Sequence, residues 1–320
     1  MVPYKFLFIG GAGFIGYHLA KYLSELGHEI VIIDNLSRGK KDNDLNTLLK
    51  KYKIKFFNLD ISSPIKIEQY DFDYIVHLAA ILGVSNVKLN PYYTLYNNIS
   101  ILDTAINFSL KCKKLKKFVF FSTSEIYAAS LRKNELSFPT SENSKVLIDQ
   151  DFPNRDSYFL SKIIGEAMVK YSKKNYIIFR PHNFFGERMG NSHVIPELFA
   201  KIISTHKKTI LLNNPNHFRC FCYIGDAVKL MSKVILSNKA NNISINVGDN
   251  TNEISIKTLA ELIRLYCNKK INFNPVFDID ESPTRRLPDI KLIMSFNKSF
   301  NFTKFEYALS KTLDWYSNFK

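Results

Sequence analysis

The chain has 320 residues, 46% of them hydrophobic, and a formal net charge of +15 at pH 7. This length suffices for one large α/β domain or for two lobes with cores of their own. No apolar run reaches the length of a membrane span, and the N-terminus leads directly into strand residues, so we expect a cytoplasmic protein without membrane contact. The 4 cysteines show no metal-type spacing, which predicts free thiols and no metal site.

The positive charge raises the question of nucleic-acid binding. The excess is lysine scattered among Asn and Ile, and aromatic residues do not interleave with it in a stripe. The densest run, Lys111 to Lys117, falls where a helix is expected to hand over to a strand, and cations stabilise a helix C-terminus. We therefore expect a solvated surface and no nucleic-acid partner. A non-catalytic RNA-binding or dinucleotide-binding protein is the alternative.

The first sixteen residues run from an apolar strand into three glycines. Gly10 allows a tight turn, Gly13 lets the backbone approach a pyrophosphate, and Gly16 lets the next helix pack closely on the strand. A second strand ends at Asp34, whose carboxylate can bind the adenosine ribose hydroxyls and would repel the extra phosphate of NADP. The unit predicts bound NAD. Arg38 leaves NADP open, because an arginine can accommodate that phosphate.

Strand and helix patterns alternate along the first two-thirds of the chain. Strands are expected at 4–9, 29–33, 54–57, 73–77, 117–122 and 176–180, and helices at 14–26, 91–110 and 157–174. The remainder predicts helix 194–206, strands 209–212 and 218–224, helix 226–237, strand 243–247, helix 255–267 and a loop-rich tail.

This order predicts an α/β fold, a doubly wound parallel (Rossmann) sheet with a smaller C-terminal substrate-binding lobe. The NAD-binding domain would comprise 1–180 plus about 225–247, and the second lobe 181–224 plus 248–320. We expect the active site in the cleft between them.

Tyr158 and Lys162 lie four residues apart on a predicted helix and therefore share a face. An ammonium beside a phenol stabilises the phenolate, which predicts a Tyr158 pKa lowered toward that of a general base. Lys162 can also reach the nicotinamide ribose. A hydroxyl of Thr123 or Ser124, at the tip of an earlier strand, would hold the reacting alcohol or carbonyl near Tyr158.

Taken in order, these motifs resemble the extended short-chain dehydrogenase/reductase family, the NAD-dependent nucleotide-sugar epimerases and dehydratases, over nearly the whole chain. One departure is Ala128, where the family usually has Gly. The resemblance implies that Thr123 is the catalytic hydroxyl, that the enzyme is a homodimer through 91–110 and 157–174, and that a larger set of residues binds NAD. That set is Gly10, Gly13, Phe14, Ile15, Gly16, Asp34, Asn35, Ser37, Asp60, Ile61, Leu78, Ala79, Ala80, Asn98, Ser122, Tyr158, Lys162 and Pro181.

The resemblance also implies a nucleotide-diphosphate sugar as substrate. Asn183 would contact its phosphates, and His193 with Val194 would cover its base. Arg219, and Arg286 within the segment 282–289, would grip the diphosphate, which requires converging guanidinium groups. Surface ion pairs for the arginines, and a capping or packing role for His193, are the alternatives.

In such enzymes NAD takes a hydride from sugar C-4 while Tyr158 removes the hydroxyl proton, and the fate of the 4-keto sugar separates the subclasses. Glu125 is the discriminating residue. Thr123-Ser124-Glu125 lacks the Asp-Glu pair of TDP-glucose 4,6-dehydratases and resembles the Thr-Ser-Glu of UDP-glucuronate decarboxylases and GDP-mannose 4,6-dehydratases; many epimerases also carry Ser-Glu. We expect 4-epimerisation, with NDP-hexuronate decarboxylation or NDP-sugar 4,6-dehydration as alternatives.

Overall fold

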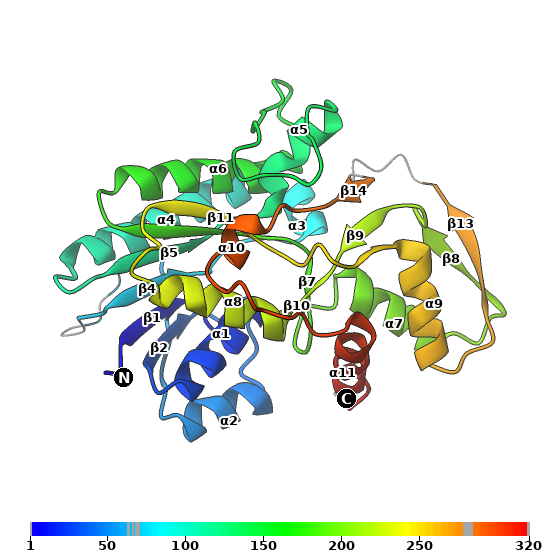
Figure 1. Cartoon of the computed structure of the whole chain (residues 1–320), viewed down its shortest axis with the longest axis horizontal. Coiled ribbons are helices and arrows are strands. Elements are labelled where there is room, and N and C mark those ends of the chain that lie inside the picture. The colour runs from blue at the N-terminus through cyan, green and yellow to red at the C-terminus, as the bar shows by residue number, and fades with distance from the viewer. Residues whose placement is uncertain (1, 63–64, 66, 68–70, 278–283, 319–320) are drawn as a thin grey trace.

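A parallel sheet of seven strands forms the centre of the first domain (Figure 1), in the order β11-β6-β5-β4-β1-β2-β3. Its strands are β1 (Lys5–Ile9), β2 (Glu29–Asp34), β3 (Lys55–Asn58), β4 (Tyr74–His77), β5 (Lys117–Phe121), β6 (Tyr176–Pro181) and β11 (Ile243–Val247). Every neighbouring pair is parallel, which confirms the predicted doubly wound sheet. This computed structural model describes residues 2–62, 65, 67, 71–277 and 284–318, so positions 282 and 283 of the late arginine segment lie outside it.

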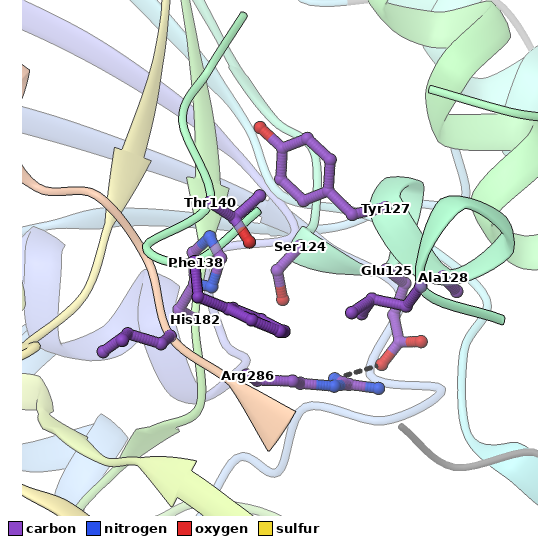
Figure 2. Close-up of a pocket in the computed structure, with 10 residues that line it drawn as sticks. Ser124, Glu125, Tyr127, Ala128, Phe138, Thr140, His182 and Arg286 are labelled. Atoms are coloured by element: carbon purple, nitrogen blue, oxygen red, sulfur yellow. Dashed lines mark ion pairs between the residues drawn. The ribbon is translucent and has the colours of Figure 1, made fainter. Parts of the chain in front are cut away.

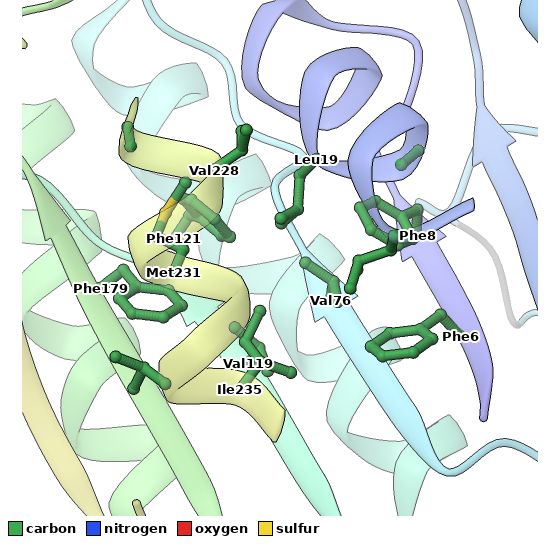
Figure 3. Close-up of a cluster of buried hydrophobic side chains, with 14 of the residues drawn as sticks. Phe6, Phe8, Leu19, Val76, Val119, Phe121, Phe179, Val228, Met231 and Ile235 are labelled. Atoms are coloured by element: carbon green, nitrogen blue, oxygen red, sulfur yellow. The ribbon is translucent and has the colours of Figure 1, made fainter. Parts of the chain in front are cut away.

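Helices cover both faces of the sheet, because successive strand side chains point to opposite sides. Phe6 and Phe8 pack under α1 (Phe14–Glu25) and α8 (Ile224–Leu236), as Figure 3 shows. Leu7 of the same strand belongs to the core on the other face. That face is covered by α4 (Pro91–Lys111) and α6 (Asp156–Tyr171). The single apolar strand β1 thus contributes side chains to both cores.

The second lobe has a core of its own. Its helices are α7 (Val194–Ser204), α9 (Ile256–Tyr266) and α11 (Phe305–Asn318). Its strands are β7 (Phe184–Phe185), β8 (Thr209–Asn213), β9 (Phe218–Cys220), β10 (Cys222–Tyr223), β12 (Glu253–Ser255), β13 (Asn272–Val276) and β14 (Arg285–Arg286). They form three small sheets, β10-β7, β12-β9-β14 and β13-β8, among the described residues.

The prediction of one strand over 218–224 is wrong. The chain changes sheets inside it: β9 pairs with β12 and β14, whereas β10 pairs with β7. The helix α8 then begins at Ile224. Cys220 and Cys222 therefore belong to different sheets, and all 4 cysteines are free.

The prediction of a loop-rich tail is wrong for α11, which buries Phe305, Ala308, Leu309 and Leu313 along one face. Shorter helices also went unpredicted: α2 (Asn43–Lys51), α3 (Val84–Leu89), η1 (Ser124–Tyr127), α5 (Ala128–Arg132) and α10 (Lys291–Met294). Each is nine residues or fewer, too short for a clear apolar period.

Two features depart from the predicted lobe boundaries and surface charge. Ile290 and Ile293 lie in the core shared with α1 and α8, so this part of 248–320 packs on the NAD-binding domain. Lys117 is buried, and its Nζ donates to the carbonyls of Ile235 (2.9 Å) and Ser237 (2.5 Å) at the end of α8. That lysine caps a helix instead of facing solvent, as the carbonyls of a helix end favour a cation.

A buried ion pair fixes α6 against the sheet. Both carboxylate oxygens of Glu166 accept from the guanidinium of Arg180 on β6, at 2.9 and 2.7 Å. The hydroxyl of Ser122, which directly follows β5, donates to the same carboxylate at 2.7 Å. Arg180 further donates to Tyr127, whose hydroxyl donates to Asn246 on β11. This network joins three strands to one helix.

Breaking that pair should cost far more stability than breaking a surface pair. Arg180→Met leaves the buried Glu166 carboxylate without its cation, so we expect a loss of about 3–5 kcal/mol in the free energy of unfolding. The matched control is Arg264→Ala, which removes a solvated pair with Glu261 on α9 and should cost less than about 1 kcal/mol. Urea unfolding measures both, and equal losses would contradict this account.

Candidate active site

The predicted catalytic side chains converge at the carboxyl end of the sheet. Tyr158 and Lys162 lie on one face of α6, and the Lys162 Nζ is 5.8 Å from the centroid of the Tyr158 ring. The same Nζ donates to the carbonyl of Phe121, the last residue of β5, at 2.9 Å. Two residues on, the Thr123 side chain hydrogen-bonds the Tyr158 hydroxyl. Strand β5 thus anchors all three groups.

Burial dominates the ionisation of this cluster. It raises the pKa of Tyr158, as does Glu125, while Arg38 and the Thr123 hydrogen bond act in the lowering direction. Burial also lowers the pKa of Lys162 to about 7, against a smaller opposing effect of Glu166. The prediction that Tyr158 has a lowered pKa is therefore wrong for this structure, because burial disfavours the charged form of both groups.

Glu125 lies two residues beyond Thr123, in η1, where the Thr123 hydroxyl accepts from the Glu125 amide at 3.2 Å. Its carboxylate binds Arg286 of β14, with Nη1 2.6 Å from Oε1 (Figure 2). Burial alone would raise the pKa of Glu125, but Arg286, Arg155 and Arg219 outweigh it and lower the pKa. The carboxylate is thus kept ionised beside Tyr158.

Three guanidinium groups surround this one carboxylate. Arg286 contacts it directly, and Arg155 and Arg219 lie close enough to act on its ionisation. Arg219 donates to the carbonyl of Phe218 at 2.7 Å, and burial together with the other arginines lowers its pKa to about 10. Three guanidinium groups against one carboxylate leave the cluster with a net positive charge, which suits an anionic ligand.

Two residues of this cluster were missed by the sequence prediction. Arg155 precedes Tyr158 by three residues, one helical turn, and that spacing was the available signal. His182 lines the same pocket as Ser124, Glu125 and Arg286. Burial lowers the pKa of His182 to about 4, so it is neutral there.

The glycine loop fits a dinucleotide. Gly10 has φ +82°, and a Cβ there would lie 2.5 Å from the backbone N of Ala79; a Cβ on Gly16 would lie 2.7 Å from the Cα of Gly11. A Cβ on Gly13 would meet only the Gly10 carbonyl, at 3.6 Å, so this position faces open space. Gly13 also caps α1 without a side-chain hydrogen bond, which leaves first-turn amides for a phosphate.

Asp34 lies at the end of β2, beside that loop. Its carboxylate accepts from the amides of Ala12 at 2.9 Å and Leu36 at 2.8 Å. Each oxygen keeps a second lone pair, so the group can still accept from ribose hydroxyls. The position agrees with the ribose role predicted for Asp34.

The other predicted cofactor residues fall into two groups. Asn35 donates to Asp60 at 3.1 Å and accepts from the Ser37 amide, so these three form one polar group. The Ile61 side chain is instead buried in the core that contains Leu7. Leu78, Ala79 and Ala80 follow β4. In contrast, the side chains of Asn98 and Ser122 are engaged within the protein: Asn98 bonds Ile81 and Ser161, and Ser122 bonds Glu166. Asn98 thus joins the chain at Ile81 to α6, and Ser122 joins the end of β5 to α6.

The predicted substrate residues lie on the second lobe. Asn183, at φ +40°, donates to the Cys220 carbonyl at 3.2 Å. His193 precedes α7 as its N-cap and makes no capping hydrogen bond with its side chain, so the capping alternative is not supported. Val194 begins that helix. Pro181, a predicted cofactor residue, is the last residue of β6.

Within the described residues, no cluster of three or more His, Cys, Asp or Glu side chains could hold a metal ion. In the same part of the chain, no helix combines the length and apolarity that crossing a membrane requires.

The family model of the NAD dependent epimerase/dehydratase family matches residues 6–248. The chain belongs to this family. It is 30% identical to a dTDP-D-glucose 4,6-dehydratase of Dictyostelium discoideum over 76% of this chain and 58% of that protein. It is 28% identical to a UDP-N-acetyl-alpha-D-glucosaminuronate decarboxylase of Bacillus cytotoxicus over 97% of both chains. A UDP-glucuronic acid 4-epimerase of Bacillus cereus, in complex with UDP-glucuronic acid and NAD, superimposes with a TM-score of 0.82 at 22% identity, covering 98% of this chain and 99% of that one.

Family membership makes the chain an NAD-dependent enzyme. A putative UDP-glucose 4-epimerase of Methanocaldococcus jannaschii is 31% identical over 81% of both chains. Resemblance to a dehydratase, a decarboxylase and this putative epimerase covers all three predicted outcomes. The choice among them depends on this chain's own pocket.

Lys162→Met should change stability in a pH-dependent way. Burial lowers the pKa of Lys162 from 10.5 to about 7 in the folded protein, so folding opposes its protonation. That cost is fully present below about pH 7 and disappears as the pH rises toward 10.5. We expect the stability of Lys162→Met relative to the parent to be highest below about pH 7 and to fall with rising pH, while turnover is lost.

Thermal unfolding across this pH range measures the difference. The control is Lys170→Met, an exposed lysine on the same helix, which should show no such trend. A relative stability of Lys162→Met that does not vary with pH would contradict the cost of burying this ammonium.

Proposed function

We propose that this chain oxidises the C-4 hydroxyl of a nucleotide-diphosphate sugar and then rearranges the 4-keto sugar. The observation that carries the proposal is the convergence of Thr123, Tyr158 and Lys162 with the Glu125–Arg286 pair at one end of the sheet. Hydroxyl, phenol and ammonium suit proton transfer at an alcohol, and the charged pair lies where the rest of the sugar would extend.

In this mechanism Tyr158 accepts the C-4 hydroxyl proton while Thr123 hydrogen-bonds the reacting oxygen. When bound, NAD supplies the hydride acceptor. Burial resists formation of the Tyr158 phenolate, and the Thr123 hydrogen bond and the Arg38 cation favour it. Lys162, with a pKa of about 7, can exchange a proton near neutral pH beside the phenol ring.

The arginines provide the binding energy. Arg219 and Arg155 together form a positively charged surface that suits a diphosphate. We assign Asn183 to the phosphates, and His193 and Val194 to the nucleotide base. Because Arg286 contacts Glu125 directly, we assign it to the sugar end of the cleft in place of the diphosphate role expected from its motif.

We consider two outcomes for the 4-keto sugar, 4-epimerisation and decarboxylation. 4-Epimerisation, the outcome favoured by the sequence, requires only that the sugar turn and the hydride return to its other face. The Glu125–Arg286 pair favours a second candidate, NDP-hexuronate decarboxylation. There the C-5 to C-6 bond breaks, carbon dioxide leaves, a proton replaces it at C-5 and the hydride returns to C-4. An arginine that holds the substrate carboxylate suits that step, and water supplies the proton that C-5 takes up.

Incubation with UDP-, GDP-, CDP- and dTDP-hexoses and their hexuronates, followed by NMR and mass spectrometry, distinguishes these outcomes. An epimer of unchanged mass supports 4-epimerisation, loss of carbon dioxide supports decarboxylation, and loss of water supports dehydration. The absence of any conversion across this panel, with NAD bound, would contradict the proposed function.

We also propose a cytoplasmic homodimer formed through α4 and α6. Large apolar side chains are exposed along these helices and just before them, which suits a covered surface. They are Leu89, Tyr92, Tyr93, Tyr96, Ile164 and Tyr171. Free thiols on all 4 cysteines agree with a reducing compartment.

Tyr158→Phe should remove most turnover and leave NAD and nucleotide-sugar binding largely intact, since only the ionisable hydroxyl is lost. We expect kcat to fall by roughly 100-fold or more, with binding unchanged by calorimetry. The control is Tyr307→Phe, an exposed tyrosine on α11, which should be neutral. Normal turnover in Tyr158→Phe would refute its assignment as the base.

Arg219→Ala and Arg286→Ala should separate binding from chemistry. Arg219→Ala should raise KM with kcat nearly unchanged, because it removes a charge from the positively charged surface. Arg286→Ala should lower kcat and raise the pKa of Glu125, because it removes the main cation beside that carboxylate. Arg285→Ala, which loses an ion pair with Glu253 and a contact with the Phe138 ring, is the neighbouring control. A pure KM effect in both variants would return Arg286 to the diphosphate role.

A further inference from the structure

Two loops from different lobes meet beside the active site, and each places an arginine against the other loop. The first, residues 35–42, joins β2 to α2 and begins with the predicted cofactor residues Asn35 and Ser37. The second, residues 186–193, joins β7 to α7 and ends at His193. Arg38 belongs to the first loop and Arg188 to the second.

Arg188 reaches from the second lobe into the NAD-binding domain. Its Nε and Nη2 donate to Asp42 at 3.2 and 2.8 Å, and Nη2 also donates to the Lys40 carbonyl at 3.2 Å. The guanidinium stacks over the ring of Tyr17 on α1, 4.1 Å from its centroid. The other oxygen of Asp42 caps α2 by accepting from the Leu45 amide. One side chain thus contacts two segments of the other lobe, the loop 35–42 and α1.

The backbone at Arg188 is strained and its side chain is buried. Its φ of +64° is a left-handed value that costs a residue with a long side chain energy. Only 5% of the side chain is exposed, and Nη1 has no hydrogen-bond partner in the described part of the chain. Simple packing would not require a strained, incompletely satisfied cation, so the position points to a functional constraint.

The rest of the second loop is held just as firmly. The Glu187 carbonyl accepts from His18 Nε2 on α1 at 2.8 Å, and its carboxylate accepts from Tyr223 at 3.1 Å. The hydroxyl of Tyr316 on α11 donates to the Met189 carbonyl. This loop therefore contacts both lobes, so a change in the NAD-binding domain reaches it directly.

The first loop lies against the glycine loop and also contacts the second loop. A Cβ on Gly39 would lie 2.7 Å from the Ala12 Cβ, so the two loops touch. Arg38 crosses the cleft in the opposite direction: a Cβ on Gly190 would lie 3.7 Å from its Nη2 and 3.7 Å from the His193 ring. The loop 35–42 thus contacts the glycine loop on one side and residues 186–193 on the other.

We propose that Arg188 is a positioning residue that couples the cofactor site to the substrate loop. Ordering of residues 35–42 by the bound dinucleotide fixes Asp42 and Lys40, and Arg188 transmits this order to residues 186–193 and so to His193. For the substrate side, this inference rests on the proposed function. Sugar nucleotide would then bind to a loop that the cofactor has already ordered, which lowers its cost of binding.

Hydrogen exchange with and without NADH tests the coupling without using turnover. In the parent protein, NADH should slow amide exchange both in 35–42 and in 186–193, by roughly fivefold or more. In Arg188→Lys and in Asp42→Asn, NADH should still protect 35–42 but should no longer protect 186–193. Lysine keeps the charge without the fork, and asparagine keeps the helix cap without the charge.

Arg285→Ala, which breaks an ion pair within the second lobe, serves as the control and should behave like the parent. Because both main variants are conservative, near-parent circular dichroism and NADH affinity are expected to show that they fold. Persisting NADH protection of 186–193 in both, or its absence in the parent, would overturn the coupling. If the panel of nucleotide sugars shows no conversion, the proposed function fails while this exchange result still decides the coupling. Where turnover is present, KM should rise in the two main variants, while kcat and its pH profile should stay unchanged.

Discussion

The buried contact between Glu166 and Arg180 fixes the rotation of α6, and the catalytic geometry depends on that rotation. Tyr158, Lys162 and Glu166 follow one another at intervals of four residues, so they lie along one face of the helix. The arginine fork on β6 and the Ser122 hydroxyl grip the last of the three. The same rotation that buries Glu166 then places Lys162 on the Phe121 carbonyl and Tyr158 beside Thr123. A buried ion pair is expensive, and its use here is to specify one register.

Charge is arranged in two zones around that face. Close to the sheet, burial favours the neutral forms of Tyr158 and Lys162, which makes their ionisation sensitive to any charge brought nearby. Toward the second lobe, Glu125 is kept ionised by surrounding arginines, among which Arg286 makes direct contact. A site with neutral proton-transfer groups on one side and a net positive wall on the other suits an anionic sugar that must exchange a proton and a hydride.

Features encoded by short-range patterns were predictable from sequence. The glycine loop, Asp34 at a strand end, and Tyr158 with Lys162 at helical spacing each depend on residues close together in the chain, and the sheet follows from strand–helix alternation. Features that depend on distant partners were not predictable. The break between β9 and β10 arises because those strands find different sheets, and the raised pKa of Tyr158 arises from tertiary burial. Arg188 finds Asp42 across the two lobes, 146 positions away in sequence. The helix α11 carried a visible apolar period and was nevertheless expected to be loop.

The central claim is that a hydride leaves C-4 of the sugar for enzyme-bound NAD. The most direct measurement mixes the NAD-loaded protein with a converted sugar nucleotide, carrying hydrogen or deuterium at C-4, and follows the near-ultraviolet absorbance of reduced nicotinamide in a single turnover. We predict a transient rise in that absorbance, slowed by deuterium, with the label still at C-4 in the product. Conversion without reduced nicotinamide, without an isotope effect and with loss of the label to water would contradict the account.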